Sequence, residues 1–285
     1  MAKPIRIVTD SSSDLTPEIQ QTYGISVVPL NVHFGTTCYP DDELPVDKFW
    51  ELAGNPHYPM TSQPSIGAYE QVFSRLVREG NSVLCVTLTS QHSGTFNAAR
   101  LAAEQFGDAV TLFDSLSLSL GLGIQAVEAA KYAQAGRRIP EILPMLGSLR
   151  ERMRLLIVLD TLEYLRHGGR AAAFMAVADG MTRALNIKVI VNLVDGRLRL
   201  LGPARSYERA LRRTLDLVQD MSPLDHLAVA HTRRSDAARE LVDRLAQRTG
   251  FPRDQIWTVE TGAVLGSHAG PGVTGVVAVP AALAP

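Results

Sequence analysis

The chain has 285 residues, of which 46% are hydrophobic and 20% are charged, a composition typical of a globular protein with one large domain or two ordinary ones. Its 28 Lys and Arg residues nearly balance its 29 Asp and Glu residues, giving a formal net charge of -1. This balance lacks the basic excess that binds nucleic acid or an anionic membrane surface, so we expect no nucleic-acid partner and at most transient membrane contact.

Three further features indicate the compartment. The sequence starts directly with a strand pattern rather than an apolar signal segment. Its most apolar window, residues 116–130, is broken by polar residues and is shorter than the roughly 20 residues of a membrane span. Cys85 lies in an apolar run and is interpreted as a small core residue. We therefore expect a cytoplasmic protein in a reducing compartment.

The first half of the chain alternates strand and helix patterns. The strands are expected at 5–9, 26–34, 82–88 and 109–113, and the helices near 16–18 and at 46–53, 66–79, 93–106, 119–135 and 140–152. Pro17 after Thr16 is a typical helix start. Alternating strands and helices predict a parallel sheet covered by helices, in an N-terminal α/β lobe at residues 1–158.

The second half has a different pattern. A strand is expected at 155–159, a hairpin at 187–194 and 198–201, helices at 207–219 and 236–248, and further strands at 226–230, 255–259 and 273–279. The pair Asp195-Gly196 suits the two-residue turn of an antiparallel hairpin. These patterns predict a C-terminal α/β lobe with a mixed sheet at residues 159–285.

Three hydroxyl-rich segments, at 9–14, 61–65 and 89–95, are the main functional signal. The first and third follow strand patterns and precede helix patterns, which is where small ligands bind in α/β domains. Hydroxyls and backbone N–H groups at helix starts suit an anion, with no need for a metal. Each segment alone also fits a simple helix cap, but two such segments in one lobe favour anion binding.

His268 lies in the glycine-rich segment 262–272, which is interpreted as a tightly turned loop. An imidazole with an ordinary pKa of about 6.5 can donate a hydrogen bond to a carboxylate or a phosphate. A lone histidine is more often an ordinary loop residue. The seven histidines show no metal-ligand spacing, so we expect no metal and no cofactor.

Common enzyme signatures are missing or misplaced. The Gly-x-Ser-x-Gly pattern of α/β hydrolases is absent, and the lack of a Gly-Lys pair excludes the phosphate-binding Gly-x4-Gly-Lys-Ser/Thr loop. Residues 121–126 match the dinucleotide pattern, but they lie several residues beyond the strand that ends near Asp114. A packing role for Gly121 and Gly123 is therefore favoured.

In chain order, the segments 7–15, 61–65, 90–95, 114–115 and 164–170 resemble the DegV family, and the resemblance extends over essentially the whole chain. It implies a two-lobed α/β fold that binds a long-chain fatty acid between its lobes. Members similar to FakB present the acid to a separate ATP-dependent fatty acid kinase, which phosphorylates the carboxylate to an acyl phosphate. The implied role is that of a lipid-binding subunit with no catalytic residues of its own.

The resemblance also implies the site residues. In the first lobe, those around the carboxylate are Thr61, Ser62, Ser93, Gly94 and Thr95. His268 is implied to reach the carboxylate from the second lobe, and Arg170 and Arg205 to lie near the head group or on the surface that faces the kinase. Apolar stretches at 25–30, 116–122 and 171–175 are candidates for the lining of the acyl chain.

Two other functions remain open from the sequence. One is a serine-dependent acyl hydrolase in which Ser93 or Ser62 is the nucleophile and His268 is the base, although the sequence shows no acidic partner for that histidine. The other is a lipid-responsive regulatory protein without a kinase partner.

Overall fold

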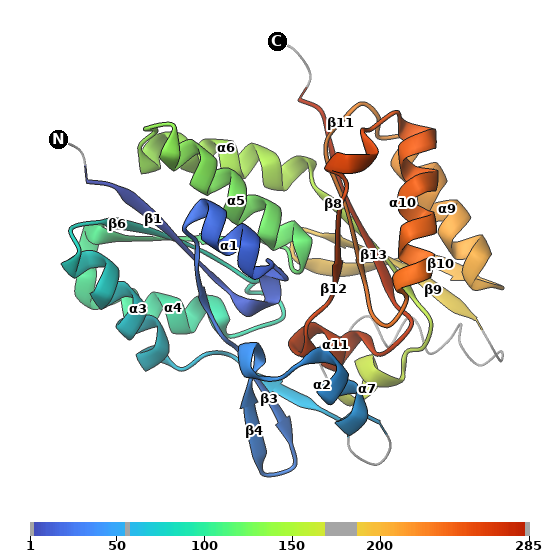
Figure 1. Cartoon of the computed structure of the whole chain (residues 1–285), viewed down its shortest axis with the longest axis horizontal. Coiled ribbons are helices and arrows are strands. Elements are labelled where there is room, and N and C mark those ends of the chain that lie inside the picture. Colours follow the sequence, from blue (N-terminus) through green and yellow to red (C-terminus); the bar gives the residue numbers. More distant parts are fainter. Residues whose placement is uncertain (1–2, 55–57, 169–186, 283–285) are drawn as a thin grey trace. The chain divides into compact units, whose positions relative to one another are not determined.

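The computed structural model describes residues 3–54, 58–168 and 187–282, and the chain divides into two compact units (Figure 1). The first unit comprises the residues up to Glu151 together with Gly262–Val264, and the second comprises Arg152–Thr261 and the residues from Leu265 onward. The division falls earlier than the boundary expected at 158/159, because strand β8 (Arg154–Leu159) pairs with other strands of the second unit.

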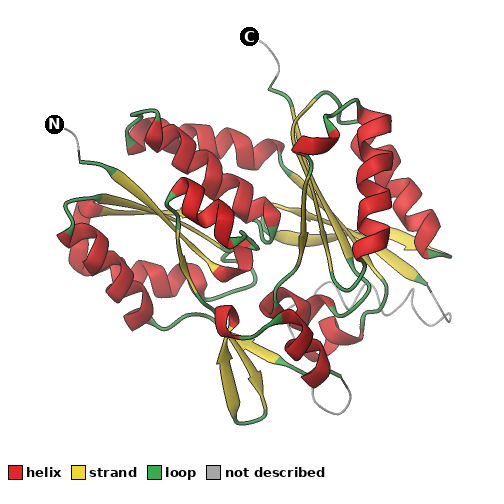
Figure 2. Ribbon diagram, viewed as in Figure 1, coloured by secondary structure: helices red, strands yellow, loops and turns green. Residues whose placement is uncertain are grey.

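The main sheet of the first unit has four parallel strands in the order β2-β1-β6-β7. They are β1 (Ile5–Asp10), β2 (Ser26–Val28), β6 (Ser82–Thr87) and β7 (Val110–Asp114). Helices α3 and α4 cover one face and α5 covers the other (Figures 1 and 2). The predicted parallel sheet is therefore confirmed, and burial on both faces explains the apolar runs at residues 7–8 and 83–86 in its two central strands.

The helices of the first unit lie close to their expected positions. They are α1 (Pro17–Tyr23), α2 (Val46–Leu52), α3 (Ile66–Arg78), α4 (Thr95–Ala103), α5 (Leu120–Gln134) and α6 (Ile139–Arg152), with 3-10 turns η1 (Ser11–Ser13), η2 (Asp41–Glu43) and η3 (Glu104–Ala109). Thr16 caps α1 and Ser65 caps α3, each accepting a hydrogen bond from the N–H three residues later. The first cap confirms the helix start predicted from Thr16-Pro17, and the second precedes the helix that was expected at 66–79.

Gly123 lies at a close contact between α5 and the turn that follows β1. A methyl group at this position would come within 2.7 Å of the carbonyl oxygen of Ser13 and 2.9 Å of the Leu15 side chain. The helix can approach the turn only because residue 123 has no side chain. The predicted packing role of this glycine is therefore confirmed.

A small antiparallel sheet completes the first unit and corrects one expectation. Its strands are β3 (Asn31–Phe34), β4 (Thr37–Pro40) and β5 (Met60–Ser62), in the order β4-β3-β5. Thr61 and Ser62 therefore lie in a strand, whereas the sequence predicted a loop at 61–65. A strand of three residues is too short to show a period-two pattern, which is why the sequence did not reveal it.

The second unit contains a six-stranded mixed sheet in the order β10-β9-β8-β13-β11-β12. Besides β8, its strands are β9 (Lys188–Val194), β10 (Arg197–Ala204), β11 (Leu224–His231), β12 (Trp257–Glu260) and β13 (Thr274–Pro280). Only the β11–β12 pair among these neighbours is parallel. Asp195 and Gly196 both have positive φ angles, as the predicted hairpin turn requires. The mixed sheet is thus confirmed.

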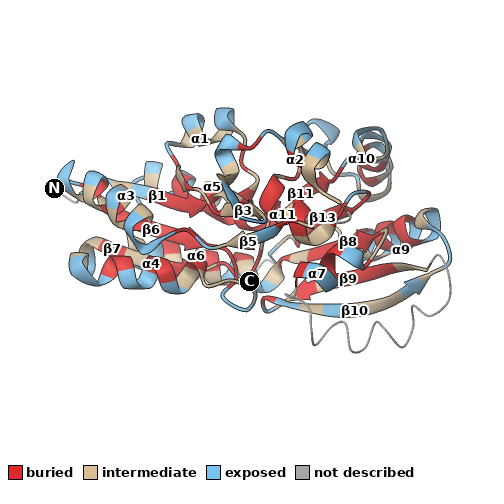
Figure 3. Ribbon diagram, turned by 90° about the horizontal axis from the view of Figure 1, so that it is seen from below, coloured by how far each residue is buried: buried red, intermediate tan, exposed pale blue. Residues whose placement is uncertain are grey.

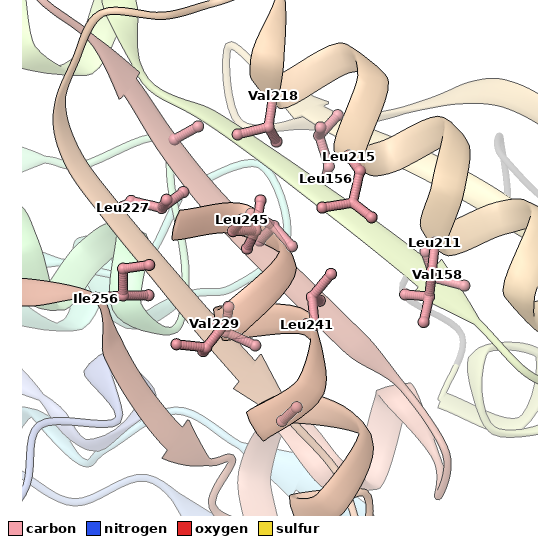
Figure 4. Packing of buried hydrophobic residues seen from close by; sticks show 14 of the residues in the cluster. Leu156, Val158, Leu211, Leu215, Val218, Leu227, Val229, Leu241, Leu245 and Ile256 are labelled. Carbon is pink, nitrogen blue, oxygen red and sulfur yellow. The ribbon is translucent and has the colours of Figure 1, made fainter. Parts of the chain in front are cut away.

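Helices α9 (Tyr207–Gln219) and α10 (Ser235–Thr249) pack on this sheet. The shorter helical elements are α7 (Glu163–Gly168), α11 (Ala263–Ala269) and the 3-10 turn η4 (Arg253–Gln255). Leu215 and Leu245 of the two helices point toward Leu156 and Val229 of the strands (Figure 4). The central strands of both large sheets are buried, while the helices expose their outer sides (Figure 3). Each unit thus has its own hydrophobic core.

The contact at Gly123 predicts opposite effects of the same substitution in two helices. Gly123→Ala should lower the free energy of unfolding by about 1–3 kcal/mol, because the methyl group meets backbone. Gly147→Ala, in α6 where a methyl group meets nothing within 4 Å, should raise it by about 0.5–1 kcal/mol. Urea unfolding of both variants measures the difference; equal effects would contradict the close contact.

Candidate functional site

The carboxyl ends of three adjacent strands carry the polar segments noted in the sequence. β1 ends at Asp10, β6 ends at Thr87 and β7 ends at Asp114. Because β1 and β7 are the two neighbours of β6 in a parallel sheet, all three ends lie at the same edge. This is the edge at which α/β domains bind small ligands.

The segment Leu88–Gly94, which we call the donor loop, connects β6 to α4. Leu88 N–H donates to Oδ2 of Asp10 at 2.7 Å. Ser90 N–H lies 3.3 Å from both carboxylate oxygens of Asp114. Side chains from the two strands beside β6 therefore hold the beginning of this loop in place.

Ser93 and Thr95 lie where the donor loop enters α4. The Ser93 hydroxyl accepts a hydrogen bond from Thr95 N–H at 3.2 Å, and the two hydroxyl oxygens are 2.8 Å apart. In such a pair one hydroxyl donates to the other, and the second keeps its own proton. The pair can therefore donate one hydrogen bond to an external acceptor such as a carboxylate.

Thr61 and Ser62 point to opposite faces of β5, because successive side chains alternate along a strand. Ser62 is paired with Asn31 across the small sheet, and its hydroxyl lies 2.9 Å from Nε2 of His33. Thr61 is paired with Val32, which is fully buried. The two predicted hydroxyls thus have different surroundings.

Ser62 and Gly94 line one pocket of about 460 Å³ within the first unit. A methyl group at Gly94 would come within 3.1 Å of the Gln63 side chain, so the carboxamide of Gln63 lies directly against the donor loop. The structure therefore brings two predicted segments, 61–65 and 89–95, into contact. Asn31 and Asn97 line the same pocket, so its polar lining includes uncharged residues.

Asp10 is a fully buried acid at this edge. Burial raises its pKa from the ordinary 3.8 to about 6, because the charged form loses its hydration. Hydrogen bonds from Leu88 N–H and from Ser12, whose hydroxyl oxygen is 2.5 Å from Oδ1, oppose this rise in pKa. Asp10 in turn raises the already high pKa values of buried Tyr69 and Cys85, for which burial is the larger cause.

The second unit contains the other predicted residues. His268 lies on α11, so the expectation of a tightly turned loop was wrong at this residue; short helices rich in glycine are hard to recognise from periodicity. Its imidazole occupies the space that a side chain at Gly168 would need. Arg205 is exposed between β10 and α9, and Arg170 and 171–175 lie outside the described residues. That His268 meets the hydroxyls of the first unit stays a prediction.

Four further residues contribute to the site: Asp10, Gln63 and Asp114 lie in segments that the sequence singled out without assigning these side chains a role, and His33 lies outside them. The two aspartates carry a recognisable signal, since each ends a strand just before a polar turn. His33 carries none, because its partner Ser62 was expected in a loop.

No group of three or more His, Cys, Asp or Glu side chains within residues 3–54, 58–168 and 187–282 is arranged to hold a metal ion. In the same part of the chain, no helix is long and apolar enough to cross a membrane.

Comparison with known proteins gives consistent matches over nearly the whole chain. A family model described as "Uncharacterised protein, DegV family" matches residues 4–281. A DegV domain-containing protein of Deinococcus radiodurans is 34% identical over 279 residues, which cover 97% of this chain and 98% of that protein.

Solved structures of similar fold include several proteins described as binding fatty acids. A fatty-acid-binding DegV family protein of Thermus thermophilus has a TM-score of 0.89 and 29% identity, covering 98% of this chain and all of that one (100%). A fatty-acid-binding DegV protein of Bacillus subtilis has a TM-score of 0.85 and 26% identity, covering 98% and 100%. A stearic-acid-binding protein of Eubacterium ventriosum has a TM-score of 0.86 and 25% identity, covering 98% of each chain.

The burial of Asp10 predicts a pH dependence of stability. Because its folded-state pKa of about 6 lies above the ordinary 3.8, the folded protein holds this proton more tightly than the unfolded chain. The contribution of Asp10 to stability is therefore fully present below about pH 4 and is lost as the pH rises to about 6. This loss lowers the free energy of unfolding by at most about 3 kcal/mol. The free energy of unfolding of Asp10→Asn minus that of the wild type should rise across this range.

Urea unfolding of both proteins at a series of pH values measures this difference. The contributions of the other titrating groups cancel, because the variant and the wild type share them. A difference that stays constant between pH 4 and 7 would contradict the raised pKa.

Proposed function

Because the chain belongs to the DegV family, we propose that it binds a long-chain fatty acid and presents the carboxylate to a separate ATP-dependent kinase, which converts it to an acyl phosphate. The observation that carries the proposal is the hydroxyl pair of Ser93 and Thr95 at the carboxyl edge of the parallel sheet. The fatty acids bound by similar proteins support the choice of ligand.

In this proposal the acyl chain supplies most of the affinity. Burial gains roughly 0.8 kcal/mol per CH2 group, so a chain of about sixteen carbons gains on the order of 10 kcal/mol before the cost of ordering it. A carboxylate drawn out of water without partners would cancel much of that gain. Hydrogen-bond donors at the head group are therefore required.

We assign the binding of the head group to Ser93, Gly94 and Thr95 of the first unit, together with one of the two hydroxyls on β5. His268 is proposed as a further donor from the second unit, and Arg205 and Arg170 as contacts of the head group or the kinase. Hydroxyls and amides bind a carboxylate without a strong ion pair. Such a carboxylate oxygen stays available to attack the γ-phosphorus of ATP, where the new O–P bond forms as the bond to the β-phosphate oxygen breaks and ADP leaves.

We assign the binding of ATP to the kinase partner, because the sequence of this chain has no Gly-x4-Gly-Lys-Ser/Thr loop. The protein then acts as the lipid-binding subunit of the kinase system.

One observation favours a second candidate function, an acyl hydrolase. Nε2 of His33 lies 2.9 Å from the hydroxyl of Ser62, which is the geometry of a serine activated by a base. Turnover of a long-chain acyl ester by the purified protein, abolished in Ser62→Ala, would support the hydrolase and contradict a purely binding role. Tight lipid binding without acyl-phosphate formation by any candidate kinase would instead support a regulatory protein.

The proposal is tested by native mass spectrometry of the purified protein, followed by organic extraction of what it carries. We expect one fatty acid per chain, or uptake of one added equivalent by the lipid-free protein. A protein that carries no fatty acid and takes none up would contradict the proposal.

Removing the hydroxyl pair should weaken head-group binding. The double variant Ser93→Ala, Thr95→Val should lower affinity for hexadecanoic acid by about tenfold or more, since a hydrogen bond to a charged group contributes about 1.5–3 kcal/mol. Acyl-phosphate formation with the kinase should fall as well. Ser148→Ala, at an exposed serine of α6, is the matched control and should bind like the wild type. If the double variant bound hexadecanoic acid as tightly as the wild type, the assignment of these hydroxyls to the head-group site would be wrong.

The opposite orientation of Thr61 and Ser62 predicts that only one of them contacts the carboxylate. Of the variants Thr61→Val and Ser62→Ala, one should weaken the binding of hexadecanoic acid by about tenfold and the other by less than about twofold. Calorimetric titration of both variants measures this. Equal losses in the two variants would contradict the assignment of the two side chains to different faces.

A further inference from the structure

We propose that Asp10 and Asp114 act as positioning residues, because together they clamp the donor loop and so fix how the adjacent hydroxyls meet the carboxylate of a fatty acid. This inference rests on the proposed function and deepens it. Neither aspartate is assigned a contact with the ligand.

The clamp follows from the order of the strands. β6 lies between β1 and β7, so the loop that leaves β6 has the end of another strand on each side. Both neighbouring strands end in an aspartate. Each aspartate turns its carboxylate toward a backbone N–H of the loop, at Leu88 on one side and at Ser90 on the other.

The N–H between these two is also held. Thr89 N–H donates to the carbonyl oxygen of Ser117 at 3.0 Å, in the segment that follows β7. Three consecutive N–H groups of the loop thus have acceptors outside it. A backbone bound at three consecutive residues has little freedom to rotate, so the direction of the chain entering α4 is set before any ligand binds.

Each carboxylate also holds the turn that follows its own strand. Oδ1 of Asp10 accepts hydrogen bonds from the N–H and the hydroxyl of Ser12, and Oδ1 of Asp114 accepts from Leu116 N–H at 3.0 Å. A carboxylate has an acceptor oxygen for each side, whereas an asparagine has one acceptor and one donor. Replacing Asp10 by asparagine therefore sets an N–H against the N–H of Leu88 or of Ser12. In Asp114, Oδ1 lies within reach of both Leu116 N–H and Ser90 N–H, so alanine rather than asparagine is needed to remove the acceptor there.

The burial of Asp10 argues for a role beyond packing. A fully buried acid costs stability, and an apolar residue of similar size often costs less. The raised pKa of Asp10 reflects that cost. Its two oxygens provide what an apolar residue cannot, namely fixed acceptors for the loop and for the turn after β1.

The experiment compares the binding of hexadecanoic acid with that of hexadecan-1-ol to the full chain, at a temperature where each variant is folded by circular dichroism. Asp10→Asn and Asp114→Ala should each weaken binding of the acid by about tenfold and binding of the alcohol by less than about twofold, because the loop positions donors for a charged head group. Asp108→Asn, at an exposed aspartate near the end of η3, is the matched control and should leave both affinities unchanged.

A uniform loss of affinity for acid and alcohol would mean that the aspartates are merely structural and would overturn the inference. So would unchanged binding of the acid in both variants. A wild-type protein that binds neither lipid would instead contradict the proposed function itself.

Hydrogen exchange in the wild-type protein gives a test that needs no variant. If the clamp exists, the amide protons of Leu88 and Ser90 exchange slowly both with and without hexadecanoic acid. Fast exchange of these amides in the lipid-free protein would show that the loop is not held in advance and would overturn the inference.

Discussion

The hydrogen bond from Leu88 N–H to the buried carboxylate of Asp10 is the interaction on which the candidate site depends. It joins the loop after β6 to the end of β1, the strand beside it, at the one edge where parallel strands leave polar groups for a ligand. Because the carboxylate is fully buried, its hydrogen bonds are strong and their loss is costly. The positions of Ser93 and Thr95 follow from where this loop begins and how it is held.

The proposed ligand fits the kind of groups found at this edge. Hydroxyls, carboxamides and backbone N–H groups bind a carboxylate with moderate strength, while a long acyl chain supplies most of the binding free energy. This division suits the proposed role, in which the protein holds its lipid firmly while a kinase reacts with the head group. The Ser62–His33 pair also resembles hydrolytic chemistry, and esterase turnover decides whether it has that role.

Much of the fold and part of the site could be predicted from the sequence. Apolar residues gather around Ile7 and Leu84 in the strands, and Thr16 and Ser65 cap helices. The local sequence pattern was therefore enough to predict these strands and helices. β5 was missed because a three-residue strand has no readable period, and with it the pairing of Ser62 with His33. The contact of Gln63 with Gly94 joins segments far apart in the chain and has no local signal.

The most direct test of the account is the NMR signal of hexadecanoic acid labelled with carbon-13 at its carboxyl group and bound to the protein. Hydrogen bonds to the carboxylate favour its charged form and so lower its pKa. We therefore expect a single bound resonance that keeps the chemical shift of a carboxylate to a pH well below the ordinary titration range of a fatty acid. The chemical shift of this resonance should change in Ser93→Ala. A bound resonance that titrates like the free acid and is unchanged by Ser93→Ala would contradict the central claim that these hydroxyls hold the head group.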